Sequence, residues 1–454
     1  MNHEFLFRKE LGRPVRVVVT GARGGFGRSL LVQCRQVPSI TLAALCDLDT
    51  AGVMALLGEL GFPEDAARIC RTAAEVREAV AAGAIVVTAE ANLLPGVPAD
   101  ILVESTGQPE ASARFARDAI DRGLHVAMVT KETDSVVGPE LNRRAVAKGL
   151  VYTTADGDQP SNLVGLVTWA RTLGFEVVCA GKSSEYDYVF DERRGTVDYT
   201  GQVVEATSLR ELWDLGSDVA GGIARRSAAL SALPQSATPD YCEMNVVANS
   251  TGLIPSRDAL NYPLCRISEL ADVFIPREDG GILDRTSVVD VFNNIRRTDE
   301  ASFGGGVFVI VRCTDAPVWE MLREKGHVVG RSGKYACIYH PYHLMGLETP
   351  MTLLSAVLHG RPSGSDRQER HAVMVARAER DFRAGETLHM GGHHHVMTDM
   401  TALLLPAVEA VGLAPFYLAA NKALRHDVAK GTLLREDAVS LDGSVLQALR
   451  NGAA

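Results

Sequence analysis

The sequence predicts an α/β protein built from a parallel-sheet domain, a mixed α+β domain and a small β-rich C-terminal domain. Three observations predict it. Apolar runs alternate with helical patterns over residues 15–152, the pattern becomes mixed after that, and short strands with turn signals follow the polar segment 361–370. We place the domain boundaries at 1–155, 156–362 and 371–444.

The first part alternates strand and helix. The run VRVVVTG, residues 15–21, is almost uniformly apolar, which is typical of a strand buried on both faces of a parallel sheet. Parallel strands need crossover connections, so helices are expected on both faces of the sheet. By the same patterns, further strands are expected at 40–47, 84–89, 99–106, 124–130 and 150–155, and helices at 26–37, 51–60, 74–83, 109–123 and 138–149.

The later parts are less regular. A helix is expected at 161–174, a buried strand at 177–181 and another strand at 304–313. The helical pattern at 349–360 is a candidate to return and pack on the first domain. Residues 361–370 hold Gly, Pro and Ser among polar residues and are expected to form a linker.

Composition narrows the function. The chain has 454 residues, a net charge of −10 and a pI near 5.7, which argues against nonspecific binding to nucleic acid or to an anionic membrane. No apolar segment is long enough for a signal peptide or a membrane span. Eight scattered cysteines, none in a CxxC pair, are expected to be small core residues in a reducing compartment, so a cytoplasmic protein is the simple interpretation.

A glycine loop, TGARGGFG, follows the first strand and opens the first helix. Its spacing, GxxGxxG, suits a tight turn, close approach of the backbone to a pyrophosphate and a helix N-terminus aimed at the anion. This strand–turn–helix context predicts a dinucleotide-binding (Rossmann) domain, with a non-binding glycine turn as the alternative. The expected cofactor residues are Gly21, Ala22, Arg23, Gly24, Gly25, Phe26 and Gly27.

Asp47 ends the second strand, 20 residues after Gly27, where a carboxylate would bind a ribose 2′-hydroxyl. A carboxylate repels a 2′-phosphate, and Leu48 and Asp49 follow with no Arg, so NAD is favoured and NADP is the alternative. Ser105, Thr106 and Gly107 close a later strand and are expected to line the nicotinamide side of the crevice.

Two lysines stand at strand ends, Lys131 and Lys182, in a chain with eight lysines and 38 arginines. Burial can shift an ammonium toward neutral pH so that it gives up a proton, which a guanidinium cannot do. Hydride transfer between an alcohol and a carbonyl needs such a group for the hydroxyl proton. We therefore expect Lys182 to be catalytic, assisted by Lys131, with solvated surface lysines as the alternative.

Asp158 and Gln159 lie in the turn that leaves the first domain, TTADGDQPSN. Together with Asp156, they are candidates to hold polar substrate groups or to tune a lysine. The equally weighted alternative is a turn followed by a helix start, because Pro160 suits the first turn of a helix.

The chain resembles the homoserine-dehydrogenase-like oxidoreductases with a C-terminal SAF domain, which include the 1-deoxy-D-xylulose-5-phosphate (DXP) reductoisomerase-like enzymes. The matching stretches are the glycine loop, ADGDQPS, FEVVCAGK, CEMNVVANSTGLIP, GGIL, GGVFVIV, HPYHLMGLETP and VLHGRP, over nearly the whole chain. The resemblance implies a homoserine-dehydrogenase-like catalytic domain, hydride transfer with NAD or NADP, and a homodimer. It also implies that Lys182 is the proton shuttle and that Lys131 helps to bind substrate.

The chain departs from that pattern around the substrate. The Asp-Gly-Thr-Lys run usual in the reductoisomerase-like members is absent before CEM, where Pro239 falls at the lysine position, and the Asn-Gly-Thr-Thr-Asn run typical of homoserine dehydrogenases is missing too. We therefore expect a divergent member acting on a small polar hydroxy or carbonyl compound. The alternatives are a metal-assisted reductoisomerase of a phosphorylated sugar and a non-catalytic NAD-binding sensor.

Three further residues are weaker substrate candidates: Glu243, Asn249 and His343. Glu243 and Asn249 are six residues apart on one predicted helix, so only one of them is expected to face a site. His340 and His343 are equally well explained as turn residues. In GGHHHV only His393 and His395 could share an ion, and we expect no metal site there.

Overall fold

The computed structural model describes residues 2–8, 12–392 and 394–452, which divide by their packing into two units. The first contains residues 1–161, 344–369 and 441–454, and the second contains residues 162–343 and 370–440. The three domain boundaries expected from the sequence stay predictions.

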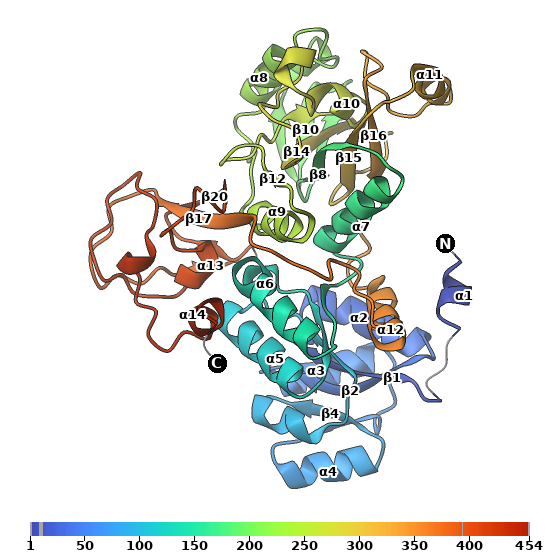
Figure 1. The fold of residues 1–454 in the computed structure, drawn as a ribbon, viewed down its shortest axis with the longest axis vertical. Coiled ribbons are helices and arrows are strands. Elements are labelled where there is room, and N and C mark those ends of the chain that lie inside the picture. The colour runs from blue at the N-terminus through green and yellow to red at the C-terminus, as the bar shows by residue number, and fades with distance from the viewer. Residues whose placement is uncertain (1, 9–11, 393, 453–454) are drawn as a thin grey trace. The chain divides into compact units, whose positions relative to one another are not determined.

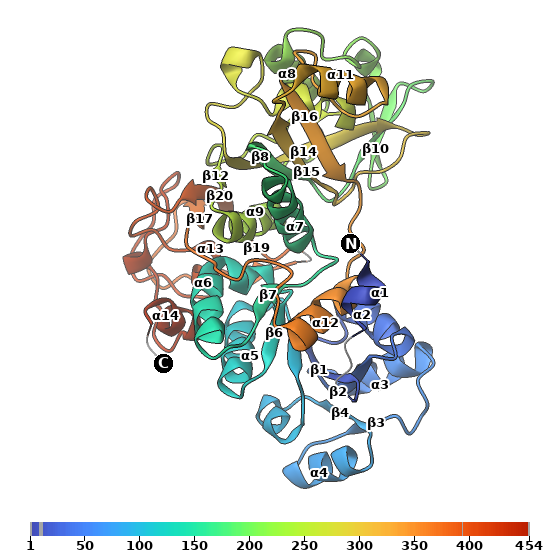
Figure 2. The same ribbon diagram turned by 45° about the vertical axis from the view of Figure 1, so that its right-hand side comes forward.

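The first unit is built on a seven-stranded sheet in the order β3-β4-β2-β1-β5-β6-β7, with every pair parallel (Figures 1 and 2). Apart from the short strand β3, this is the doubly wound order of dinucleotide-binding sheets, which confirms the predicted α/β fold with a Rossmann-like domain. The strands are β1 (Val15–Thr20), β2 (Ile40–Cys46), β3 (Ala67–Ile69), β4 (Ile85–Thr88), β5 (Ile101–Glu104), β6 (His125–Met128) and β7 (Tyr152–Thr154), and the helices between them are α2 (Gly25–Gln36), α3 (Thr50–Glu59), α4 (Ala73–Ala81), α5 (Pro109–Asp121) and α6 (Lys131–Ala147).

Two late helices complete this unit. Helix α12 (Thr349–His359) packs against β1, β6 and α2, as Figures 1 and 2 show, and its leucines Leu353, Leu354 and Leu358 join the same apolar core as β1. Helix α14 (Val445–Arg450) packs on α5 and α6. The helix expected at 349–360 therefore packs on the first sheet.

Two local predictions were wrong. Helix α6 begins at Lys131 rather than at 138 and runs through Pro139, which leaves one intrahelical hydrogen bond unmade without ending the helix. Residues 361–370 do not form a free linker, because much of the segment is tied to the first unit. Ser363 donates to Asp156 (2.6 Å) and the amide of Gly364 donates to Thr153 (2.8 Å).

The second unit contains a mixed sheet in the order β11-β10-β9-β14-β8-β15-β16. The central strand β8 (Val177–Ser183) is buried at every residue and pairs in parallel with β14 and antiparallel with β15. The other strands are β9 (Tyr188–Asp191), β10 (Thr196–Tyr199), β11 (Gln202–Glu205), β14 (Val288–Arg297), β15 (Val307–Arg312) and β16 (Tyr335–His340), with β12 (Ile254–Pro255) and β13 (Leu264–Cys265) beside β14; the helices are α7 (Gln159–Thr172, starting at the end of the first unit), α8 (Val219–Ala229), α9 (Thr238–Thr251), α10 (Leu270–Val273) and α11 (Ala316–Glu324).

The C-terminal module, which we define as residues 370–440, belongs to the second unit. It is rich in short strands, as predicted: β17 (Ala372–Ala378) pairs with β20 (Met400–Pro406), and β18 (Met390–Gly391) pairs with β19 (Val396–Met397). Its inner face is a small core that includes Val375 and Leu403.

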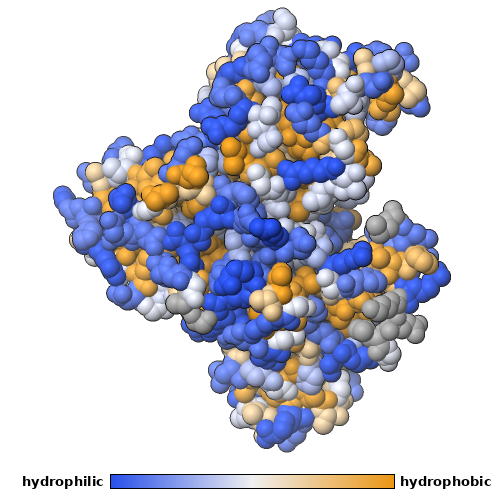
Figure 3. All heavy atoms as spheres, in the orientation of Figure 1, coloured by the Kyte–Doolittle hydropathy of each residue, from blue (hydrophilic) through white to orange (hydrophobic). Residues whose placement is uncertain are grey.

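The polarity of the surface and the state of the cysteines agree with what the composition predicts. The face drawn in Figure 3 is largely hydrophilic with smaller apolar patches. All eight cysteines are free thiols, and seven of them are buried. Among the helices of the described residues, none combines the length and the apolar character that crossing a bilayer would need.

Candidate functional site

The glycine loop joins β1 to α2 at the carboxyl edge of the first sheet. Gly21 has φ +68°, and a Cβ atom there would lie 2.4 Å from the carbonyl oxygen of Ser105. A Cβ atom on Gly27 would lie 2.5 Å from the carbonyl oxygen of Ala22. Position 21 accepts only glycine because the turn after β1 runs directly against the turn after β5, and position 27 does so because α2 lies directly against Ala22 of the same loop.

The N-terminal end of α2 has the features that an anion needs. The N-cap is Gly24, which has no side chain to bond the first amides of the helix. Gly24 and Gly25 are exposed, and a Cβ atom on either would meet nothing closer than 3.4 Å. Free amides and the helix dipole therefore face open space, which fits a pyrophosphate. Of the neighbouring loop residues, Arg23 is exposed, whereas Ala22 and Phe26 are buried.

Asp47 lies next to this loop, as predicted, and it also supports the loop. Its carboxylate accepts hydrogen bonds from the backbone amides of Arg23 (3.0 Å) and Asp49 (3.1 Å). The sequence argument that favoured NAD considered only the residues that follow Asp47 in the chain. The fold brings Arg23 to Asp49, with which its guanidinium forms an exposed ion pair.

The turn after β5 is organised by Glu104, a residue that the sequence reasoning missed. The Glu104 carboxylate is fully buried and accepts hydrogen bonds from the Thr106 hydroxyl (2.6 Å) and the Ser112 hydroxyl (2.6 Å). Burial raises the pKa of Glu104 against these hydrogen bonds. Ser105 donates to the carbonyl of Thr20, and the amide of Gly107 donates to Thr130. A carboxylate that ends the apolar run ILVE was the available signal.

Lys131 and Asp158 are brought together in the first unit. Lys131 is the first residue of α6, and its ammonium lies 3.1 and 3.2 Å from the two carboxylate oxygens of Asp158. Asp158 is nearly buried, and it also accepts from the backbone amide of Gln159, the buried first residue of α7. Asp158 therefore pairs with a lysine and directly precedes a helix, and its role in holding substrate stays a prediction.

Lys182 is the centre of a buried charged cluster in the second unit. Its Nζ atom lies 2.6 Å from Oδ1 of Asp240 and also contacts a carboxylate oxygen of Glu243. The hydroxyl of Ser184 donates to the other Asp240 oxygen (3.0 Å). The Lys182 and Asp240 side chains are each 1% exposed. We call Lys182, Ser184, Asp240 and Glu243 the lysine cluster.

Two elements assemble this cluster. Lys182 is delivered by β8, and both carboxylates come from α9, where their i, i+3 spacing puts them on one face. Of the two predicted candidates on this helix, Glu243 faces the cluster. Asp240 was missed, although the DxxE spacing after Pro239 was visible in the sequence.

The charge state of Lys182 differs from the expectation. Burial by itself would lower the pKa of Lys182, but Asp240 and Glu243 outweigh burial and raise it. Lys182 is therefore a firmly protonated ammonium rather than an amine near neutrality. Burial raises the pKa of Asp240 in turn, despite the nearby ammonium, and the negative charge of Glu243 adds to that rise.

The other weak candidates lie elsewhere. Asn249 faces away from the lysine cluster and accepts hydrogen bonds from the backbone amides of His371 and Ala372. Its carbonyl oxygen is therefore engaged by backbone, and a contact of Asn249 with substrate stays an untested prediction. His343 is half-buried in the segment after β16.

The structure describes only part of the histidine run. His393 lies outside the described residues, and His394 approaches Glu185 at 3.6 Å. Within residues 2–8, 12–392 and 394–452, no three His, Cys, Asp or Glu side chains are grouped as metal ligands would be.

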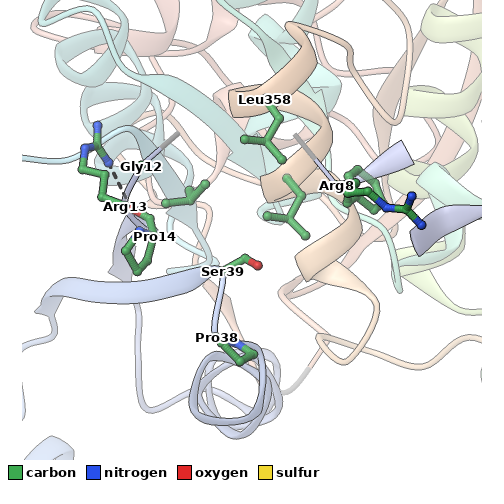
Figure 4. A pocket seen from close by; sticks show the side chains of 10 residues that line it. Arg8, Gly12, Arg13, Pro14, Pro38, Ser39 and Leu358 are labelled. Carbon is green, nitrogen blue, oxygen red and sulfur yellow. Dashed lines mark hydrogen bonds between the residues drawn. The ribbon is translucent and has the colours of Figure 1, made fainter. Parts of the chain in front are cut away.

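A cavity of about 410 Å³ lies at the opposite edge of the first sheet, beside Val15 and Ser39 (Figure 4). Val15 opens β1 and Ser39 precedes β2, so the cavity is at the amino ends of the strands. Sheets of this topology bind ligands at the carboxyl ends of their strands. The cavity is also bordered by Arg8 and Gly12, on either side of residues 9–11, which the structure does not describe. We therefore do not assign it to the candidate site.

Comparison with solved structures gives only weak likenesses. The dihydrodipicolinate reductase from Paenisporosarcina sp. TG-14 is 12% identical, with a TM-score of 0.38 over 77% of this chain and 97% of that one. A DOX-P reductoisomerase solved with NADPH, fosmidomycin and magnesium is 14% identical, with a TM-score of 0.33 over 53% of this chain and 59% of that one. Other DOX-P reductoisomerase structures are covered over 46% and 58% of their length. These likenesses are too weak to assign an activity.

The sequence comparisons are more informative about the second unit. None of the curated proteins compared with the chain matches it. Residues 157–349 match the family model described as the catalytic domain of oxidoreductase DRL. The whole lysine cluster, together with Asp158 and Gln159, therefore lies in a segment similar to an oxidoreductase catalytic domain.

Proposed function

We propose that this protein is an NAD(P)-dependent oxidoreductase that transfers a hydride between nicotinamide and a small polar hydroxy or carbonyl compound. One observation carries the proposal. A buried lysine, held by two carboxylates at the end of a central strand, lies inside the segment that matches an oxidoreductase catalytic domain. Perturbed ionisable groups of this kind are concentrated at catalytic sites.

The first unit has residues suited to hold the dinucleotide. The backbone amide of Gly25, at the start of α2, would bind the pyrophosphate, and Asp47 would accept from a ribose hydroxyl. Ser105, Thr106 and Gly107, at the carboxyl end of β5, would line the nicotinamide side. A bound nicotinamide supplies or accepts the hydride.

Lys182 is proposed to move the proton. When a substrate carbonyl is reduced, the Lys182 ammonium gives a proton to the oxygen that gains negative charge. Asp240, whose carboxyl group lies 2.6 Å from the same nitrogen, is proposed to replace the proton that the lysine gives up. In the oxidative direction, the Lys182 ammonium first gives a proton to the Asp240 carboxylate, and the resulting amine takes the hydroxyl proton of the substrate.

Lys131 is proposed to bind a polar group of the substrate. Its ammonium is partly exposed, with 23% of the side chain accessible, and the nearly buried Asp158 fixes its position. An ammonium held in this way binds a carboxylate, phosphate or carbonyl oxygen.

The first test is a titration with NADH and NADPH separately, followed by nicotinamide fluorescence, and then a turnover screen against small hydroxy acids, aldehydes and sugar phosphates. Binding together with turnover that is lost in Lys182→Arg supports the proposal. Turnover of a phosphorylated sugar that EDTA abolishes would replace it with the metal-assisted reductoisomerase. Binding without turnover of any compound would favour a nucleotide sensor, and absence of binding would refute the proposal.

A further inference from the structure

Helix α9 presents two different polar faces to two different partners. Asp240 and Glu243 face Lys182 on β8, whereas Asn245 and Asn249 face the C-terminal module. At about 100° per residue, Asn245 and Asn249 lie roughly 140° and 180° around the helix axis from Asp240. The helix is therefore clamped between the catalytic strand and the module, and Figures 1 and 2 show it running beside β17.

The amide face bonds to β17 as a neighbouring strand would. Asn245 donates to the carbonyl of Ala372 (2.9 Å) and accepts from the amide of Met374 (3.0 Å). Asn249 accepts from the amides of His371 (2.9 Å) and Ala372 (3.1 Å).

Both asparagines are fully or almost fully buried. A buried backbone donor or acceptor that loses its partner keeps the full cost of desolvation, so these four bonds fix α9 firmly against the strand.

The positions of Asp240 and Glu243 depend on these four hydrogen bonds between α9 and the module. Glu243 and Asn245 are two residues apart on the same rigid helix, so a shift of α9 on β17 moves both carboxylates relative to Lys182. Proton transfer needs heavy-atom distances of about 2.6–3.2 Å, and a displacement of about 1 Å can lower a rate by roughly 100-fold.

We propose that Asn245 and Asn249 are positioning residues, which anchor α9 to β17 so that Asp240 and Glu243 hold the Lys182 ammonium in place. This inference rests on the proposed function of Lys182. It also gives the C-terminal module a role, because the module supports the side of α9 that lies opposite the lysine cluster.

The test compares Asn249→Ala, which removes the acceptor, with Asn249→Asp, which keeps an oxygen for the same two amides. Arg383→Ala is the matched control, because Arg383 lies in the same module in an exposed ion pair with Asp427. The first readout is the infrared carboxyl band of Asp240, assigned by its loss in Asp240→Asn. The second is the pH profile of kcat, with cofactor affinity measured in parallel.

We expect Asn249→Ala to shift the carboxyl band, to lower kcat by roughly 100-fold with an altered pH profile, and to leave cofactor affinity unchanged. Asn249→Asp should restore the wild-type band and most of kcat, and Arg383→Ala should match the wild type throughout.

A folded Asn249→Ala protein with the wild-type band and pH profile would overturn the inference. If that variant does not fold, Asn245→Asp, which removes only the donor to Ala372, is judged by the same two readouts. The infrared band needs no substrate, so it decides the inference separately from the proposed function. Full turnover in Lys182→Arg would overturn the proposed function alone.

Discussion

The ammonium nitrogen of Lys182 lies 2.6 Å from a carboxylate oxygen of Asp240, and both side chains are almost completely buried. A second carboxylate, from Glu243, contacts the same nitrogen. Two acids around one base in a water-poor place form a group whose protonation is shared. The first predictions follow from this arrangement.

Two substitutions of Lys182 distinguish the role of its positive charge from its role in proton transfer. Lys182→Arg keeps the positive charge but cannot release a proton at any relevant pH, so kcat should fall by about 100-fold or more while cofactor affinity persists. Lys182→Met leaves two buried carboxylates without a counter-ion and should also lower the free energy of unfolding by about 3–5 kcal/mol. Steady-state kinetics and urea unfolding check the two effects, with Lys148→Arg, at an exposed ion pair with Asp121, as the control.

Asp240→Asn should move the alkaline limb of the pH profile of kcat/KM to lower pH. Asp240 is the strongest influence that raises the pKa of Lys182, and burial opposes it. Without that carboxylate, burial lowers the pKa of Lys182 with less opposition, so the ammonium loses its proton at lower pH. An alkaline limb that stays in place would show that Lys182 does not control this part of the profile.

Cofactor choice should depend on the pair Asp47 and Arg23. Asp47→Ala removes the proposed acceptor for the ribose hydroxyl and two hydrogen bonds that shape the loop, so NADH should bind at least 10-fold more weakly. Arg23→Ala removes the one cation that the loop offers next to Asp49, so NADPH binding should fall more than NADH binding. Fluorescence titrations with both nucleotides measure the two ratios. Equal losses for NADH and NADPH in Arg23→Ala would contradict a role in selectivity.

Comparing Gly21→Ala with Gly83→Ala should distinguish the backbone strain of a positive φ from the steric clash of an added Cβ atom. Gly83 has nearly the same φ, +70°, but a Cβ atom there meets nothing within 4 Å, so Gly83→Ala should cost only about 1–2 kcal/mol of backbone strain. At Gly21 the added carbon also collides with the Ser105 carbonyl. The loss of stability should be clearly larger at Gly21 and should be accompanied by loss of nucleotide binding. Similar losses in the two variants would mean that the turns after β1 and β5 can separate freely.

Asp134 should make stability depend on pH. It is buried in α6, where it accepts a hydrogen bond from Tyr152 (2.8 Å), and burial raises its pKa from 3.8 to about 7. The folded protein therefore favours the neutral acid. Stability from this group is complete below pH 3.8 and is lost as the pH rises to about 7, because the unfolded chain ionises first.

Asp134→Asn removes the loss of stability that the wild type suffers when the buried carboxyl group ionises. The variant should be more stable than the wild type at pH 8, by up to roughly 4 kcal/mol, and should differ much less near pH 4. Urea unfolding at both pH values measures the difference. Asp118→Asn, at an exposed position of α5, is the control and should show no such trend.

The sequence predicted the parts of the fold that depend on local pattern. The strand–helix alternation and the glycine spacing placed the first sheet and its loop, because a buried parallel strand and a tight turn each leave a signature within a few residues. Lys182 was recognisable because it ends an apolar run.

The sequence did not predict which residues the fold would bring together from distant parts of the chain. Asp240 lies 58 residues from Lys182 in the chain, and Arg23 lies 26 residues from Asp49. The charge state of Lys182 was mispredicted for the same reason: burial could be inferred from the strand, but the carboxylates that outweigh it could not. The role of Asn249 was equally hidden, since its partners are amides more than 120 residues away.

The first unit is discontinuous along the chain, since it is assembled from residues 1–161, 344–369 and 441–454. Its last piece is α14, where the Ser444 hydroxyl and the Val445 amide donate to Glu110 of α5. During synthesis, the first sheet emerges early, yet it must wait for most of the chain before α12 can pack on it and α14 can pack on α5 and α6. Folding of the two units is therefore interleaved in time, and a ribosome that stalls before residue 441 would release a chain in which the faces of α5 and α6 that α14 covers are exposed.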